Sequence, residues 1–338
     1  MTPLTNSLLK PVRAGIAGLG MCVPQRVLTN EELSRMVETN SEWIVSRTGI
    51  HERRIADSDT TTSDLAFEAA KIALEHASLE PGEIDLVLCA TTSGDYLWPS
   101  TACLVQHRLG ATRAAAFDLG AACSGFCYGL ATASSFIESG MMKNILLIGA
   151  DTLSKQVDWQ DRSTCILFGD GAGAAVLTAC SPDEGVLASI MGADGSGSEA
   201  VWLPAGGTKI PITQEVIDQK LNCLRMKGQE VYRFTMNVIP ELIIKVLKQV
   251  CLTPNDIDLL VLHQANARII SSIGDRLGIP PERNYINVHK YGNTSAATVP
   301  MALVEAQHEG RLKRGDLVVT VGYGAGLTWA ANVIRWNQ

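Results

Sequence analysis

An internal repeat constrains the fold of this chain more than any other feature of its sequence. Residues 80–88 and 253–262 both begin with a proline-marked turn and continue through Ile-Asp-Leu into an apolar run, and each segment follows an amphipathic helical stretch. A helix, a turn and a buried strand in the same order twice predict two copies of one α/β unit. We therefore expect an α/β fold with two halves, residues 1–182 and 183–338.

Two further pairs of segments extend the repeat. Small residues precede a helical pattern around Cys123 and again at residues 291–296. Each half then ends in a Gly-rich bend that feeds a strand, at residues 168–177 and 321–329. Because the two small-residue turns stand at equivalent points of the halves, we expect them to converge on one cleft.

The first Gly-rich bend also raises the alternative of a dinucleotide site, since Gly169, Gly171 and Ala174 fit a loose G-x-G-x-x-A fingerprint. A phosphate-binding loop of that kind needs a helix directly after its glycines. Residues 174–179 are instead a short apolar run that is soon broken by Pro182, which is typical of a strand. We expect these glycines to serve close packing or the approach of the backbone to a ligand.

Composition and charge limit the classes of protein to which this chain can belong. With 46% hydrophobic and 19% charged residues it reads as a soluble globular protein, and its net charge of −7 argues against binding to nucleic acid. The nine cysteines form no Cys-x-x-Cys pair and no zinc-like cluster, which predicts a reducing compartment and no structural metal. Residues 1–11 lack the pattern of a secretion signal, and no apolar run reaches membrane-spanning length. We expect a cytoplasmic protein that does not bind a membrane.

Cys123 is the first candidate for catalysis. It stands between an apolar run and a helical pattern that extends to about residue 140, which predicts a thiol at a helix N-terminus. Unpaired N–H groups and the helix dipole at such a place favour the thiolate, the nucleophilic form of cysteine. The alternative is that Cys123 is simply a small buried residue.

His263 and Asn293 are the candidates that accompany it. His263 ends the apolar run of residues 259–262, and strand ends are where α/β proteins hold their reactive side chains. Asn293 lies in the small-residue turn of the second half. Each residue alone also fits a structural role, His263 as a core histidine and Asn293 as a turn or cap residue. Together with Cys123 they form a known nucleophilic grouping.

Three motifs give the chain a resemblance to a known family. They are Ala-Cys-Ser-Gly-Phe around Cys123, His-Gln-Ala-Asn from His263 and Gly-Asn-Thr-Ser-Ala around Asn293, and the likeness extends from residues 18–20 to residues 324–329. The chain resembles β-ketoacyl-acyl-carrier-protein synthase III of the thiolase-like superfamily. Three related groups of enzymes match less well. Elongating condensing enzymes of that superfamily carry two histidines, whereas this chain has His263 and Asn293, and thiolases carry a second cysteine near the C-terminus, whereas this chain has none after Cys251. Plant-type polyketide synthases share the three residue types but are longer. The resemblance implies a thiolase-like fold in which two duplicated α/β halves form a layered α-β-α-β-α core.

The resemblance also implies a reaction. Cys123 would take a short acyl group from acyl-CoA and condense it with malonyl-acyl-carrier protein, with loss of CO₂, as the initiating step of fatty acid synthesis. His263 and Asn293 would stabilise the enolate, and the backbone N–H groups of Cys123 and Ala325 would form an oxyanion hole. No cofactor is implied. An acyltransferase or a condensing enzyme of specialised metabolism on the same scaffold stays open as the alternative.

Five residues match positions at which the family binds CoA. The resemblance implies that Trp43 stacks on the adenine and that Arg47 and Arg162 meet the phosphates or the adenine edge. It also implies that Gly228 and Asn266 line the pantetheine tunnel. Judged alone, Trp43 is a half-buried helix residue and the arginines belong to a solvated surface.

Two protein partners follow from the same resemblance. Arg233, Arg268 and Arg276 would form a basic patch for the acidic acyl-carrier protein, although Asp275 stands where the family can have lysine. The second partner is another copy of the chain, because Trp98 stands where a family residue reaches across a homodimer interface and closes the partner's acyl pocket. The large ring predicts a preference for short acyl groups, and an ordinary interface anchor is the alternative.

Overall fold

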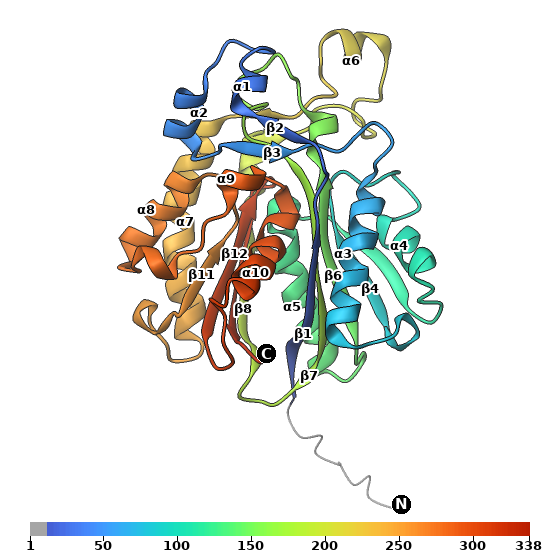
Figure 1. Ribbon diagram of the computed structural model, residues 1–338, viewed down its shortest axis with the longest axis vertical. Coiled ribbons are helices and arrows are strands. Elements are labelled where there is room, and N and C mark those ends of the chain that lie inside the picture. The colour runs from blue at the N-terminus through green and yellow to red at the C-terminus, as the bar shows by residue number, and fades with distance from the viewer. Residues whose placement is uncertain (1–11) are drawn as a thin grey trace, which may run out of the picture.

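Two β-sheets, each with helices on both faces, form the core of the molecule (Figure 1). The computed structural model describes residues 12–338, so the segment in which we found no secretion signal lies outside the described residues. The first sheet has the strand order β1-β7-β6-β4-β5, with the bounds Arg13–Cys22, Asp170–Cys180, Ile145–Thr152, Leu86–Ala90 and Ala115–Leu119. β7 runs antiparallel to both of its neighbours, whereas β4 runs parallel to β6 and to β5.

The second sheet repeats this arrangement with one strand fewer. Its strand order is β8-β13-β12-β11, with the bounds Gly185–Ala193, Thr328–Arg335, Leu317–Gly324 and Leu259–Leu262. β13 runs antiparallel to both neighbours and β11 runs parallel to β12, as β7 and β4 do in the first sheet. The repeat predicted from the sequence is therefore confirmed in the order and direction of the strands. The expected boundary at residues 182–183 falls in the connection between β7 and β8.

Three pairs of helices complete the layers. α3 and α4 cover the outer face of the first sheet, α7 and α8 cover that of the second, and α5 and α10 lie between the sheets (Figure 1). The bounds of these helices, in chain order, are Thr62–Ala77, Thr101–Leu109, Gly125–Glu138, Gly228–Lys248, Ala267–Leu277 and Thr298–His308. Buried residues of the two central helices, such as Phe126 and Leu303, pack against both sheets. The expected α-β-α-β-α core is confirmed.

Most of the remaining elements gather at one end of the sheets, at the top of Figure 1. These short elements are β2 (Val27–Thr29), α1 (Asn30–Leu33), α2 (Ser41–Thr48), β3 (Glu52–Arg54), β9 (Val201–Trp202), α6 (Gln214–Asp218), β10 (Arg225–Met226) and α9 (Val288–Tyr291).

The long helices begin and end at recognisable sequence signals. The Thr61 hydroxyl accepts from Asp64 N at the start of α3, while the Asp64 carboxylate accepts from Thr61 N, which is a capping box. Gly110 and Gly278 end α4 and α8 in the left-handed conformation that glycine adopts without strain. These two glycines occupy equivalent points of the repeat.

The structure of β7 distinguishes between the two interpretations of the first Gly-rich bend, a strand and a phosphate-binding loop. The glycines lead into a strand that is buried from Asp170 to Leu177, and no helix follows them. The predicted strand is confirmed, and a phosphate-binding loop is excluded at this point. Close packing explains the glycines, because a Cβ at Gly173 would lie only 2.7 Å from the Pro300 Cβ of α10.

Candidate active site

Cys123, His263 and Asn293 line one cavity of about 200 Å³. Cys123 precedes α5, His263 follows β11 and Asn293 precedes α10, so both halves contribute to the site. The other residues of the wall are mostly apolar: Leu167, Phe168, Val201, Met226, Gly228, Val231, Tyr232, Ala265, Asn266, Ile269, Tyr323, Gly324 and Ala325. The convergence expected from the repeat is confirmed, and it gives three polar groups in an apolar pocket.

Cys123 lies in a 3₁₀ turn, Ala122–Ser124, which leads directly into α5 and which we call the nucleophile turn. Ala122 has a φ of +45°, a left-handed conformation that is uncommon for residues other than glycine. On the opposite side Gly324 packs so closely that a Cβ there would lie 3.0 Å from the Cys123 sulfur. The predicted position of Cys123 at a helix start is confirmed.

The expected thiolate is not found. Burial raises the pKa of the Cys123 thiol to about 12. A hydrogen bond with the Ser295 side chain lowers this pKa, the negative charge of Asp151 raises it, and neither effect is as large as that of burial. The expected resting thiolate disagrees with this raised pKa, because the loss of water around the sulfur favours the neutral thiol.

His263 is buried at the end of β11, where its backbone N–H donates to Val321 O over 2.7 Å. Its Nδ1 lies 2.7 Å from the Thr298 hydroxyl, and its ring meets the Tyr323 ring edge-on with 5.2 Å between the ring centres. Burial lowers the pKa of His263 to about 3, so the imidazole is neutral at ordinary pH. The Thr298 hydroxyl also donates to Ser295 O over 2.9 Å; when it turns to donate to Nδ1 instead, the neutral ring presents its Nε2–H as a donor.

Asn293 is fixed through both its backbone and its side chain. Its N–H donates to Leu167 O over 2.8 Å and its carbonyl accepts from Gly169 N over 3.1 Å, which ties it to the segment before β7. Its Oδ1 accepts from Ser295 N over 2.9 Å, so the side chain keeps Nδ2 as its donor. Ser295 begins a second 3₁₀ turn, Ser295–Ala297, which leads into α10 and which we call the second turn.

Ala325 follows β12 and lines the same cavity as Cys123. The structure thus brings together the two residues whose N–H groups we expect to form an oxyanion hole. Their role in binding an oxyanion stays a prediction.

The five residues expected to bind CoA form a connected group. The guanidinium carbons of Arg47 and Arg162 lie 5.8 and 5.4 Å from the centre of the Trp43 ring. Asn266 Nδ2 donates to Arg47 O over 3.0 Å, and both Asn266 and Gly228 line the cavity. Asn266 therefore joins the cluster around Trp43 to the cavity, whereas CoA binding itself stays a prediction.

The three arginines expected to dock a carrier protein are exposed on α7 and α8. Arg233 belongs to α7, and Arg268 and Arg276 belong to α8. The Arg276 guanidinium donates to Met236 O over 2.7 Å and so links the two helices. Asp275 is exposed beside Arg276, which reduces the positive charge of this surface.

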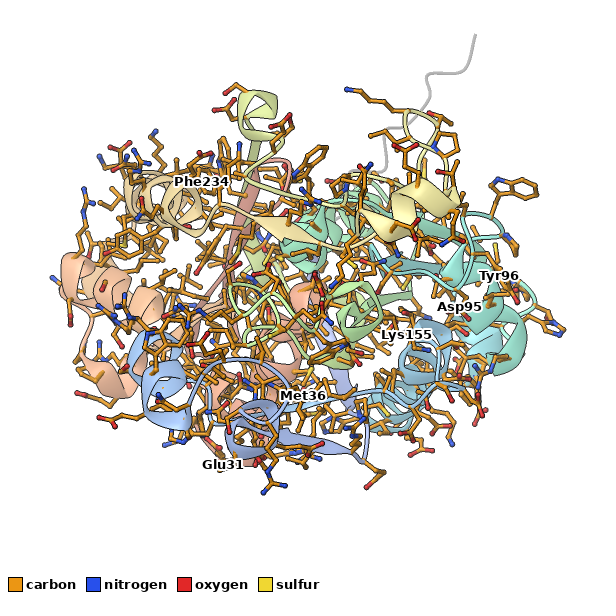
Figure 2. The ribbon with its side chains drawn as sticks, turned by 90° about the horizontal axis from the view of Figure 1, so that it is seen from above. Glu31, Met36, Asp95, Tyr96, Lys155 and Phe234 are labelled. Carbon is orange, nitrogen blue, oxygen red and sulfur yellow. The ribbon has the colours of Figure 1, made fainter. Side chains whose placement is uncertain are left out.

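Trp98 does not line the cavity of its own chain. It is 84% exposed and follows two further exposed apolar residues, Tyr96 and Leu97. Figure 2 shows Tyr96 and its neighbour Asp95 at the outer edge of the molecule. Phe117, on the edge strand β5, is also exposed.

Sequence reasoning missed three residues that hold the site in place: Asp151, Ser295 and Thr298. Asp151 follows the apolar run of β6 as His263 follows that of β11, so a charged residue at a strand end was the available signal. Ser295 and Thr298 lie among small residues after Asn293, and only this proximity could have pointed to them.

No helix within residues 12–338 is long and apolar enough to cross a membrane. No group of three or more His, Cys, Asp or Glu side chains in the same residues could hold a metal ion.

Comparisons with known proteins agree on one family. Its profiles, described as 3-oxoacyl-acyl-carrier-protein synthase III and the C-terminal part of the same enzyme, match residues 117–195 and 247–336. A β-ketoacyl-acyl-carrier-protein synthase III of Caldanaerobacter subterraneus is 51% identical over 98% of this chain and 100% of its own length. Crystal structures of 3-oxoacyl-acyl-carrier-protein synthase III from Aquifex aeolicus and Pseudomonas aeruginosa are 46% and 40% identical, with TM-scores of 0.89 and 0.90. Each covers 96% of this chain, and the chain covers 100% and 99% of them.

Proposed function

The chain belongs to the β-ketoacyl-acyl-carrier-protein synthase III family, the condensing enzymes that initiate fatty acid synthesis, and we propose that Cys123, His263 and Asn293 carry out its two half-reactions. The observation that carries this proposal is the convergence of these three side chains from both halves on one largely apolar cavity. A thiol, a neutral imidazole and a carboxamide suit acyl transfer followed by stabilisation of an enolate.

In the first half-reaction the Cys123 sulfur attacks the thioester carbonyl of acyl-CoA. The carbonyl oxygen becomes an oxyanion, which the N–H groups of Cys123 and Ala325 stabilise. CoA then leaves, and the proton of the Cys123 thiol ends on the CoA sulfur. Since burial holds the pKa of Cys123 at about 12, this proton stays on the resting enzyme and moves only when a thioester is bound.

In the second half-reaction malonyl-acyl-carrier protein loses CO₂, and its thioester becomes an enolate. His263 Nε2–H and Asn293 Nδ2–H donate to the enolate oxygen; Ser295 N already orients the Asn293 amide, and donation from the Thr298 hydroxyl to His263 Nδ1 places the proton on Nε2. The enolate carbon then attacks the acyl thioester on Cys123. A carbon–carbon bond forms, the bond between the acyl carbon and sulfur breaks, and the Cys123 sulfur leaves and takes up a proton from solvent.

The first substrate is an acyl-CoA. The Trp43 ring offers a stacking surface for adenine, and the adjacent Arg47 and Arg162 offer positive charge for the phosphates. Asn266 and Gly228 mark the way into the cavity, whose apolar wall suits a short acyl chain. The proposed steps need only side chains and backbone groups of this chain and the two substrates, and they include no cofactor.

The second substrate arrives on acyl-carrier protein, which docks on the exposed arginines of α7 and α8, Arg233, Arg268 and Arg276. A second copy of the chain is the other partner. The exposed loop around Trp98 and the exposed edge strand β5 suit a homodimer interface. We place this homodimer in the cytoplasm, with neither nucleic acid nor a membrane among its partners.

One assay tests the proposal. Acyl-CoA and malonyl-acyl-carrier protein are supplied together, and CO₂ release and the β-ketoacyl product are measured. We expect both from the parent protein, and mass spectrometry after acetyl-CoA alone should show an acetyl adduct on Cys123. The Cys123→Ser variant should fold and form no adduct, because the hydroxyl is a far weaker nucleophile than the thiol. A parent protein without the adduct, or a serine variant that is fully acetylated, would contradict the proposal.

A further inference from the structure

The nucleophile turn and the second turn are the same structure, built once in each half. Their first residues, Ala122 and Ser295, both have left-handed backbones, with φ of +45° and +54°. Each turn leads directly into a helix, α5 or α10, that lies between the sheets. Position by position, the counterpart of Cys123 in the second turn is therefore Ala296.

The backbone of each turn packs directly against a strand of the opposite half. A Cβ at Gly322 of β12 would lie 2.7 Å from Ser124 Cα and 3.1 Å from Cys123 O. A Cβ at Gly149 of β6 would lie 2.3 Å from Ala296 O. Both glycines are present because the backbone of a turn approaches the backbone of a strand at this point.

The two strands carry different residues two positions beyond these contacts. β12 continues to Gly324, which packs directly against the Cys123 side chain, whereas β6 continues to Asp151. At the contact between β6 and the second turn, the Ala296 N–H donates to Asp151 Oδ2 over 3.3 Å. The N–H of Cys123, its counterpart, is the group we assign to the oxyanion of the substrate. The Asp151 carboxylate thus takes, in the second half, the place of that oxyanion.

Asp151 is held firmly in this place. Its side chain is fully buried, and Oδ1 accepts from Thr91 Oγ1, from Ser93 Oγ and from the backbone N–H groups of Thr92 and Ser93, over 2.7 to 3.1 Å. These donors all belong to the loop after β4. With Oδ1 occupied in this way, Oδ2 is the atom that receives Ala296, so one carboxylate clamps the β4 loop to the second turn.

We propose that Asp151 is a positioning residue for condensation, which holds the second turn through Ala296 so that Ser295 N keeps the Asn293 amide aimed at the substrate. The inference rests on the role proposed above for Asn293. The chain of contacts is short, from Asp151 Oδ2 to Ala296 N and from Ser295 N to Asn293 Oδ1 at 2.9 Å. Asp151 acts on the second half-reaction through this chain and touches neither substrate.

The variant Asp151→Asn tests this directly. Oδ1 has four or more donors to keep, so the new amide group faces the Ala296 N–H, and two donors meet where one hydrogen bond existed. We expect the rate of condensation at saturating malonyl-acyl-carrier protein to fall about 10- to 100-fold, as for small misplacements of a reacting group. Formation of the acyl-enzyme should not slow, because Cys123 packs against β12 and not β6, and removal of the Asp151 charge lowers the pKa of the Cys123 thiol rather than raising it.

Asp85→Asn is the matched control. Asp85 lies just before β4, at the end of that strand opposite Thr91, and its carboxylate also accepts backbone N–H groups, from Lys143 and Asn144. Its replacement should lower thermal stability without separating the two half-reactions. Equal losses of acylation and condensation in Asp151→Asn would overturn the proposal, as would an unchanged rate of condensation.

A double variant identifies the route of the effect. If Asp151 acts through Asn293, adding Asp151→Asn to Asn293→Ala should slow condensation by less than about twofold further, since the amide to be positioned is gone. Full additivity of the two losses would contradict the proposal. An Asn293→Ala protein that condenses at the parental rate would instead overturn the role of Asn293 in the proposed function, which keeps the two failures apart.

Thr91→Val provides the second variant if Asp151→Asn does not fold. Valine keeps the shape of threonine but removes two hydrogen bonds of the Thr91 hydroxyl, the 3.1 Å bond to Asp151 Oδ1 and the 3.2 Å bond accepted from Ser93 N, while the carboxylate and its bond to Ala296 remain. We expect a loss of condensation of about two- to fivefold with acylation unchanged. Parental condensation in Thr91→Val would then overturn the proposal.

Discussion

At the scale of single residues, the site depends on groups that are kept neutral. Burial holds Cys123 as a thiol, with a pKa of about 12, and holds His263 as an uncharged imidazole, with a pKa of about 3. Burial therefore favours the uncharged forms of both side chains over a thiolate beside an imidazolium. Reactivity must come from the bound thioester, whose developing oxyanion finds donors already in place, and not from a charge stored on the sulfur.

His263→Ala and Asn293→Ala should separate the half-reactions. Both variants should still form the acyl-enzyme on Cys123, while condensation falls about 10²- to 10³-fold, the usual cost of one oxyanion donor. Acyl-enzyme is measured by mass spectrometry and condensation by CO₂ release. Release at the parental rate from either variant would show that its role is assigned wrongly.

Thr298 should matter to condensation through the proton on His263. Its hydroxyl donates to Ser295 O over 2.9 Å and lies 2.7 Å from His263 Nδ1, so its one proton has to turn from Ser295 O to Nδ1 for this role. Only donation to Nδ1 leaves the proton on Nε2, where the enolate needs it. We expect Thr298→Val to slow condensation about tenfold with acylation nearly unchanged, and Thr298→Ser to restore the parental rate. Serine and valine variants of equal activity would speak against this role.

At the scale of elements, the nucleophile turn packs so closely against β12 that the contact should not accommodate an added side-chain atom. Gly322→Ala places a Cβ 2.7 Å from Ser124 Cα, which is backbone and cannot rotate away. The nucleophile turn must shift, so we expect a loss of about 1–3 kcal/mol in the free energy of unfolding together with a slower acylation step. Gly82→Ala is the control, because nothing lies within 4 Å of a Cβ there and its backbone is unstrained.

Denaturant unfolding and the rate of acetyl-enzyme formation measure these two effects. Gly82→Ala should change the free energy of unfolding by less than about 0.5 kcal/mol. If Gly322→Ala acylates and unfolds like the parent, then the contact between β12 and the nucleophile turn tolerates an added methyl group, which contradicts this prediction.

The elements that sequence patterns predicted best are those defined by local signals. The amphipathic stretches became α3 and α7, the apolar runs became β4 and β11, and the proline-marked turns join each helix to its strand. Periodicity and turn residues act within a few positions, so these elements are visible in the sequence. Asp151 was missed for the opposite reason, since its contact with Ala296 joins residues 145 positions apart. The thiolate at Cys123 was wrongly predicted because a helix start is visible in a sequence, whereas the depth of burial is a property of the folded chain.

At the scale of the whole molecule, the exposed surface of the described chain is where a partner is needed. Tyr96, Leu97 and Trp98 are 63%, 87% and 84% exposed in one loop, which is unusual for three consecutive large apolar residues. The loop lies at the edge of the molecule rather than at the cavity (Figure 2). Burial of this loop in the proposed homodimer would remove these three side chains from water.

Trp98 should then set the length of the acyl chain that the partner's cavity accepts. The family resemblance implies that its ring closes the end of that pocket in the dimer, and extra methylenes against such a wall would cost about 1–3 kcal/mol or more. We expect kcat/KM to favour acetyl-CoA over octanoyl-CoA in the parent, and Trp98→Ala to reduce this preference by about tenfold or more as the wall recedes. An interface anchor without contact to substrate would instead weaken the dimer and leave the ratio of the two constants unchanged. Size-exclusion chromatography of parent and variant tells these cases apart, and a parental preference for octanoyl-CoA would contradict the short-chain assignment itself.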